Sequence, residues 1–193
     1  LLGRVHDAEQ VRKSFAILRA TGFDNLNLDL IYGIPGQTLA QWEESVRATI
    51  ALGPEHISAY CLTYEEDTEF FERMARGEFR EDAESDAGFF ERGVTLLTDA
   101  GYGQYEISNH ARAGRECHHN LAYWEGADYL GLGPSAWSTI GERRWQNVPD
   151  TAAYGRAVEA GVRPIRDEEI LPPATREAEK IAFGLRMNAG IDP

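Results

Sequence analysis

Apolar and polar positions in the first third of the chain alternate between helical and strand spacing. A capping box is predicted at Asp7 and Gln10, and apolar residues follow it at helical intervals. Residues 25–32 then alternate strictly, with mostly apolar side chains on one face and Asn27 and Asp29 on the other. The first pattern predicts an amphipathic helix, and the second predicts a strand with one apolar and one partly polar face.

A second helix–strand pair follows the turn at residues 33–36. Thr38 and Gln41 again match a capping box, the apolar residues behind them have helical spacing, and Gly53 marks the end of this helix. Residues 56–63 form the next predicted strand. Because helix and strand alternate at this spacing, the pattern favours right-handed βαβ units on a parallel sheet, and the predicted fold class is α/β.

The rest of the chain contains weaker patterns and no internal repeat or flexible linker. Further helices are predicted at residues 68–76, 82–100, 119–124, 150–158 and 175–187, and strands at residues 102–107 and 129–132. The glycines on either side of Leu132 are interpreted as a turn where the backbone approaches another group closely. The chain starts without methionine and ends directly after a helical pattern, so we expect both ends to be cuts through a longer protein.

Composition excludes several classes of protein. The 193 residues carry a formal net charge of −13, which argues against non-specific nucleic-acid binding because such a surface repels phosphates. No apolar run approaches the ~18 residues that a membrane span needs, and the start lacks a signal-peptide pattern. The two cysteines, Cys61 and Cys117, argue against a disulfide framework and favour a cytoplasmic protein. They are also too few for a four-iron cluster, which needs roughly three or four thiolates.

Candidate ligand contacts lie near the carboxyl ends of the predicted strands, where α/β sheets and barrels bind ligands. Asp29 is on the polar face of its strand, and a ligand hydroxyl or amine could supply the donors that a buried carboxylate needs. The alternative is a structural aspartate bonded to backbone or to an arginine. Arg4 could pair with a carboxylate, although an isolated arginine is more often a surface residue. Thr63, at the end of the next strand, indicates nothing by itself.

The segment at residues 117–124 combines cysteine, histidine and aromatic side chains. A zinc site is not expected, because adjacent side chains point apart and no second cluster of cysteine and histidine completes a tetrahedral set. On a helix, His119 and Tyr123 share a face with Trp124 beside it, so an imidazole among aromatic rings could receive a flat macrocycle and ligate its iron. The alternative is an aromatic helix that packs on a sheet, a common use of tyrosine and tryptophan.

Six segments, taken in order, resemble the later half of the radical-SAM barrel in oxygen-independent coproporphyrinogen oxidases and HemW-type heme chaperones. They cover residues 2–10, 27–38, 56–60, 105–109, 119–124 and 131–136. The resemblance implies the later part of a partial (β/α) barrel over residues 1–147, followed by the start of a helical C-terminal domain over residues 148–193. It also implies S-adenosylmethionine and a 4Fe-4S cluster as cofactors, with the C-x3-C-x2-C ligands of the cluster upstream of Leu1. Arg4, Asp29 and Thr63 match positions that contact S-adenosylmethionine in this family.

The HNxxYW pattern separates the two branches of this family. His119, Asn120, Tyr123 and Trp124 resemble the pattern associated with heme binding in the HemW branch, which implies a heme chaperone with His119 as the ligand of the iron. One departure is Trp137, since HemW-type proteins often have histidine there. The implied partners are heme and heme-accepting proteins, including membrane-associated respiratory components, and the implied location is cytoplasmic or peripheral to a membrane. A homodimer is among the assemblies that the family allows.

Two other functions stay open at this point. The first is an anaerobic coproporphyrinogen oxidase, which would decarboxylate propionate side chains through a 5′-deoxyadenosyl radical, so enzymatic activity is undecided. The second is a scaffold without activity, because the cluster ligands are absent from this chain and a partial barrel exposes a strand edge.

Overall fold

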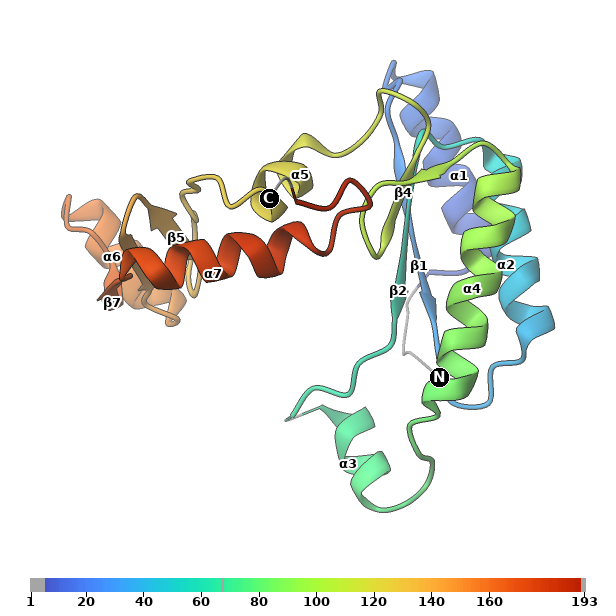
Figure 1. Cartoon of the computed structure of the whole chain (residues 1–193), viewed down its shortest axis with the longest axis horizontal. Helices are drawn as coiled ribbons and strands as arrows, with labels where there is room; N and C mark the ends of the chain where they lie inside the picture. Colours follow the sequence, from blue (N-terminus) through green and yellow to red (C-terminus); the bar gives the residue numbers. More distant parts are fainter. Residues whose placement is uncertain (1–5, 67, 192–193) are drawn as a thin grey trace. The chain divides into compact units, whose positions relative to one another are not determined.

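The chain divides between Glu116 and Cys117 into two compact units. The computed structural model describes residues 6–66 and 68–191 (Figure 1). In the first unit the elements in chain order are α1 (Ala8–Ala20), β1 (Asn27–Tyr32), α2 (Leu39–Leu52), β2 (His56–Cys61), α3 (Glu69–Ala75), α4 (Ala83–Asp99), β3 (Gly103–Gln104) and β4 (Asn109–Ala111). The capping boxes predicted before α1 and α2 are both present.

The sheet of the first unit has the strand order β1-β2-β4-β3. β1 and β2 pair in parallel, with Asn27 opposite His56 and Asp29 opposite Ser58, and α2 connects them. This arrangement confirms the predicted βαβ unit. β4 pairs antiparallel with both β2 and β3, so the sheet is mixed and not wholly parallel as the alternation of helix and strand predicts.

The predicted strand at residues 102–107 is wrong in its extent. Only two residues form β3, and the chain then turns, with the backbone amide of Asn109 donating to the carbonyl of Glu106 (3.3 Å). Tyr102 is fully buried, and its hydroxyl donates to the carbonyl of Pro54 (2.7 Å), which fixes the chain just before this short strand. A two-residue strand beside a tight turn is too short to display the alternation that identifies strands in a sequence.

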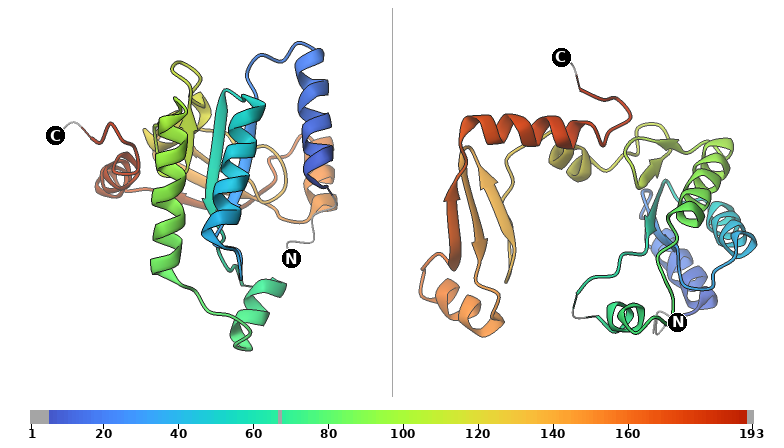
Figure 2. Two further views of the ribbon diagram at one scale, coloured as in Figure 1. Left: turned by 90° about the vertical axis from the view of Figure 1, so that its right-hand side faces the viewer. Right: turned by 60° about the horizontal axis from the view of Figure 1, so that its bottom comes forward.

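Helices α1, α2 and α4 lie side by side on one face of this sheet (Figure 2). Trp42 of α2 has no exposed surface, and its indole nitrogen donates to the carbonyl of Phe89 (2.8 Å), which ties α2 to α4. A Cβ on Gly93 would come within 3.0 Å of the Trp42 ring, so glycine there lets the two helices approach closely. The buried core consists of Tyr32, Trp42, Val46, Ile57, Ala59, Phe89, Leu97 and Tyr102.

The predicted alternation along β1 is confirmed. Leu30 and Tyr32 pack against the core on the helical side, whereas Asn27 and Asp29 are exposed on the opposite face. The polar face of β1 is therefore directed away from the helices, where a ligand could reach it.

The second unit contains α5 (His118–Trp124), β5 (Trp137–Ile140), β6 (Arg143–Asn147), α6 (Thr151–Glu159), β7 (Ile165–Ile170) and α7 (Pro173–Gly184). Its strands form an antiparallel sheet in the order β5-β6-β7. The three helices were predicted close to these bounds, but the sheet was not predicted, and β7 lies within the range expected to be helical. The division of domains at residues 147 and 148 stays a prediction, because a compact unit need not coincide with a domain of a family.

The predicted strand at residues 129–132 is wrong, since only Tyr129 forms an isolated bridge with β5. The glycines that follow are held in a turn, where the side-chain amide of Asn147 donates to the carbonyl groups of two of them. A Cβ on Gly131 would overlap the carbonyl of Trp137, which confirms the predicted close approach of backbone. Among the described residues, no helix has the length and apolar character needed to cross a membrane.

Candidate functional site

The face of β1 and β2 that points away from the helices is polar. Asn27 and Asp29 of β1 lie on it beside His56 and Ser58 of β2, because residues paired in a parallel ladder share a face. Asn27 and Asp29 are exposed, whereas His56 and Ser58 are almost fully buried. The side-chain amide of Asn27 donates to Asp29 Oδ1 (2.7 Å). Asp29 is therefore bonded by a side chain of its own strand while its carboxylate remains on an exposed surface.

Hydrogen bonds join this face to the loop before β4. His56 Nδ1 lies 2.7 Å from Asn27 Oδ1, and His56 Nε2 lies 2.8 Å from the hydroxyl of Tyr105. The hydroxyl of Ser58 also donates to Asn27 Oδ1 (3.2 Å). Burial lowers the pKa of His56, so its imidazole is neutral at neutral pH. No sequence pattern predicts this network, and its one signal is that Asn27 precedes Asp29 by two residues and so shares its face.

Of the three residues assigned to S-adenosylmethionine by resemblance, the structure describes Asp29 and Thr63, which lie apart along the strand direction. Arg4 lies outside the described residues. Thr63 is exposed beyond the end of β2, and its hydroxyl donates to Glu65 (3.2 Å). Ser58, the partner of Asp29, precedes Thr63 by five residues, which span at most roughly 16 Å at ~3.3 Å per extended residue. Only an elongated ligand could contact both Asp29 and Thr63.

Glu106, in the turn between β3 and β4, and His110 of β4 are buried polar side chains that no sequence pattern indicated. Glu106 is 1% exposed and accepts hydrogen bonds from the backbone amide of Ser108 (3.3 Å) and from the side-chain amide of Asn109. His110 is equally buried, and this burial lowers its pKa to about 4. The imidazole of His110 is therefore held in its neutral form.

The second candidate site is on α5, where the predicted helix is confirmed. His119 is exposed one turn before Tyr123, whose ring stacks on Phe183 of α7 with centroids 5.6 Å apart. Trp124 meets the same ring edge-on at 6.0 Å, and the guanidinium of Arg186 lies 4.5 Å from the centroid of Trp124. The aromatic residues of α5 thus pack on a helix and not on a sheet. Among residues 6–66 and 68–191, no three His, Cys, Asp or Glu side chains converge as a metal site.

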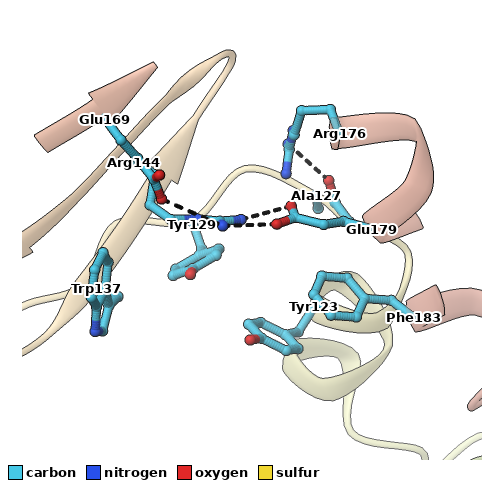
Figure 3. A pocket seen from close by; sticks show the side chains of 10 residues that line it. Tyr123, Ala127, Tyr129, Trp137, Arg144, Glu169, Arg176, Glu179 and Phe183 are labelled. Carbon is cyan, nitrogen blue, oxygen red and sulfur yellow. Dashed lines mark hydrogen bonds and ion pairs between the residues drawn. The ribbon is translucent and has the colours of Figure 1, made fainter. Parts of the chain in front are cut away.

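A cavity of about 290 Å³ lies beside α5 within the second unit (Figure 3). Tyr123, Tyr129, Trp137 and Phe183 form its aromatic walls. Its aromatic walls can pack on the edge or a substituent of a flat ligand such as a porphyrin.

The charged side of the cavity is already paired. Arg144 binds both carboxylate oxygens of Glu179 (2.8 and 2.7 Å) and lies 3.8 Å from Glu169 (Figure 3). Arg176 pairs with Asp128 (3.2 Å). The hydrogen bond from Arg144 lowers the pKa of Glu179, which keeps this carboxylate ionised. Because each arginine faces a carboxylate, the cavity is a charge-balanced aromatic pocket and not an anion site.

The chain is similar to named heme chaperones, although no family model matches it. It is 37% identical over 191 residues to a heme chaperone HemW of Bacillus subtilis and 36% identical over 191 residues to one of Mycobacterium tuberculosis. Each alignment covers 98% of this chain but only 50% and 49% of the relative. The chain therefore spans about half the length of the curated relatives it matches.

A solved structure has the same fold. Coproporphyrinogen III oxidase (HemN) from Escherichia coli, a radical-SAM enzyme, matches with a TM-score of 0.75 at 22% identity, covering 97% of this chain and 46% of that chain. This likeness confirms the predicted α/β fold of the radical-SAM type. The chain is therefore similar in sequence to about half of the HemW heme chaperones, and it has the fold of part of a radical-SAM coproporphyrinogen oxidase.

Proposed function

We propose that this chain is part of a heme chaperone that binds heme through His119 and passes it to acceptor proteins. The observation that carries the proposal is the exposed imidazole of His119, one helical turn before Tyr123, whose ring lines the aromatic cavity. Similarity to proteins named heme chaperone HemW supports it. Membrane-associated acceptors, a cytoplasmic location, association with a membrane surface and a homodimer belong to the same proposal.

The side chains of α5 fit heme as a ligand. Heme offers a flat apolar macrocycle and an iron that one axial imidazole can ligate. The i, i+4 spacing places His119 and Tyr123 on one face, and Trp124 and Phe183 extend the aromatic surface beside them. The macrocycle would lie on the exposed face of α5, with an edge in the cavity that Tyr123 lines.

The presence of tryptophan at position 137 leaves the proposed heme iron with a single protein ligand. Its side chain is 44% exposed and lines the same cavity as Tyr123, at the position where HemW-type proteins often carry histidine. An indole does not ligate iron, but its ring can stack on a flat ligand. We therefore infer that His119 is the one ligand that this unit supplies.

Asp29 and Thr63 are the described residues that would contact S-adenosylmethionine. The exposed carboxylate of Asp29 fits a cofactor that offers hydroxyl and ammonium donors, and an elongated cofactor could also reach Thr63. A 4Fe-4S cluster does not fit this chain, whose two cysteines lie in different units. The ligands of the cluster are therefore assigned to residues outside this chain.

The test is a hemin titration of the chain, followed by its Soret band, in the wild type, His119→Ala and His118→Ala. His118 is the matched control, because it is also an exposed histidine on α5. We expect a saturable, shifted band in the wild type and in His118→Ala and its loss in His119→Ala. Equal titration curves in the two variants would rule out His119 as a specific ligand.

The oxidase alternative makes a different prediction. An oxidase would convert coproporphyrinogen to a decarboxylated porphyrin product once its cluster and S-adenosylmethionine are present, whereas a chaperone retains heme without turnover. Chromatography of the porphyrins after incubation with the cluster-containing holoprotein distinguishes the two. Stoichiometric heme loading without decarboxylated product supports the chaperone.

A further inference from the structure

Four side chains on the polar face of the first unit form one continuous chain of hydrogen bonds. Asn27 Nδ2 lies 2.7 Å from Asp29 Oδ1, Asn27 Oδ1 lies 2.7 Å from His56 Nδ1, and His56 Nε2 lies 2.8 Å from the hydroxyl of Tyr105. All three distances are within the range of good hydrogen bonds. The residues come from β1, β2 and the loop before β4, so the chain crosses three segments of the fold.

The chemistry of the groups fixes the direction of every bond in this chain. An ionised carboxylate only accepts, so the amide nitrogen of Asn27 must face Asp29 and its oxygen must face His56. That oxygen also only accepts, so the proton of His56 is on Nδ1. His56 Nε2 is then an acceptor, and the hydroxyl of Tyr105 donates to it. The four groups therefore specify one tautomer of His56 and one orientation of the Asn27 amide.

His56 is the most buried of these four side chains, and exposure increases from it toward Asp29. His56 is 5% exposed, and Ser58, which also donates to Asn27 Oδ1, is 2% exposed. The ring of Tyr105 packs edge-on against His56 with centroids 5.6 Å apart. Asn27 and Asp29, at the other end, are exposed. The buried side chains of His56 and Ser58 thus hold Asn27 in place. Asn27 in turn restricts the exposed carboxylate of Asp29, which would otherwise sample several rotamers.

We propose that His56, with Tyr105 behind it, is a positioning residue that acts through Asn27 to aim the Asp29 carboxylate at hydroxyl or amine donors of a bound ligand. The inference rests on the proposed role of Asp29 in binding S-adenosylmethionine. Asn27 engages Asp29 Oδ1, which restricts the rotation of the carboxylate and leaves Oδ2 for the ligand. Pre-orientation of this kind reduces the ordering cost that binding must overcome.

The first experiment tests the chain of bonds without any ligand. The nitrogen chemical shifts of His56, measured by ¹⁵N NMR on this protein, should show the Nδ1–H tautomer at neutral pH. Tyr105→Phe removes only the hydroxyl and should shift the ring toward a mixture of tautomers, whereas Tyr60→Phe, an exposed tyrosine of β2, should leave it unchanged. An Nε2–H tautomer in the wild type would overturn the proposal.

The second experiment measures S-adenosylmethionine binding by calorimetry in the cluster-containing holoprotein. Asn27→Ala and His56→Leu should each weaken binding by roughly five- to tenfold, and Tyr105→Phe by roughly threefold, while Asp29→Asn weakens it more than any of them. Circular dichroism confirms that each variant is folded. If Asp29→Asn weakens binding and the other three do not, the positioning role is wrong and the proposed cofactor contact stands. If Asp29→Asn has no effect on binding, the positioning role of His56 and the proposed contact of Asp29 with the cofactor are both wrong.

Discussion

The two candidate sites are assembled in different ways. On β1 and β2, the register of one parallel ladder decides which side chains share the polar face with Asp29. In the second unit, Tyr123, Trp137 and Phe183 come from α5, β5 and α7 and meet only through packing. A site set by register persists as long as the strands pair, whereas a site set by packing depends on every turn between its elements. Perturbations of the two units should therefore have separable effects.

The largest expected effect is a loss of stability in the first unit that leaves the second unit unchanged. Trp42→Ala removes a fully buried ring and its hydrogen bond to Phe89, and it should destabilise the first unit by about 3–5 kcal/mol. Urea unfolding followed by the aromatic signals of each unit measures this, beside a hemin titration. Leu132→Ala, at a side chain that is 80% exposed, is the control and should change the free energy of unfolding by less than about 0.5 kcal/mol. Loss of hemin binding in Trp42→Ala would contradict the separation of the two sites.

The next effect is a pH dependence of the free energy of unfolding, which is expected in the first unit because His110 belongs to it. Burial lowers the pKa of His110 from 6.5 to about 4, so between these values the unfolded chain binds a proton that the folded unit excludes. Stability from this group is complete above the unfolded pKa and decreases as the pH falls toward the folded pKa, by about 3 kcal/mol in the limit. Burial lowers the pKa of His56 too, which adds a contribution of the same sign.

The measurement for His110 is the urea midpoint from about pH 7 to about pH 4.5 in the wild type, His110→Phe and His118→Phe. His110→Phe should flatten the dependence, and His118→Phe, at an exposed histidine of the second unit, should retain it. Parallel curves for the wild type and His110→Phe would show that the burial of His110 does not govern acid stability.

The sequence predicted the first unit better than the second, for a physical reason. The strands and helices from Asp7 to Cys61 are long and periodic, so capping boxes and alternation identify them, and the exposed position of Asp29 follows from the same alternation. The hydrogen-bonded partners of Asp29 depend on strand pairing and on a loop at Tyr105, which no local pattern encodes.

In the second unit the sequence identified α5 and the shared face of His119 and Tyr123, because one helical repeat suffices for that. It could not identify the cavity, whose walls at Trp137 and Phe183 are brought to Tyr123 by an unpredicted antiparallel sheet and by α7. In β7 nearly all residues are exposed, so apolar and polar residues do not alternate along it, and the sequence pattern gives no sign of the strand. Packing between distant elements is the part that periodicity leaves undetermined.

A smaller effect is expected at the charged wall of the cavity. Arg144→Met leaves the partly buried Glu179 without its bidentate partner and should destabilise the second unit by roughly 1–3 kcal/mol. The double variant Arg144→Met, Glu179→Met should recover much of this loss, because it removes both charges together. Arg143→Met is the matched control, since Arg143 and Glu168 form a more exposed pair worth at most about 1 kcal/mol. Equal losses for Arg143→Met and Arg144→Met would contradict a special role for this pair in the cavity.

The smallest effects compare one helix cap in each unit. Thr38 caps α2 in a reciprocal box with Gln41 (3.3 and 2.9 Å), whereas Asp150 caps α6 through a single bond from the amide of Ala153 (2.7 Å). Replacement of either residue by alanine should cost about 1 kcal/mol, and replacement by glycine only a few tenths, because glycine exposes the first amides to water. Thr38→Ala should lower the unfolding midpoint of the first unit alone and Asp150→Ala that of the second. If either variant shifted both transitions equally, the units would unfold as one cooperative body, and differences between the two candidate sites could not be assigned to local stability.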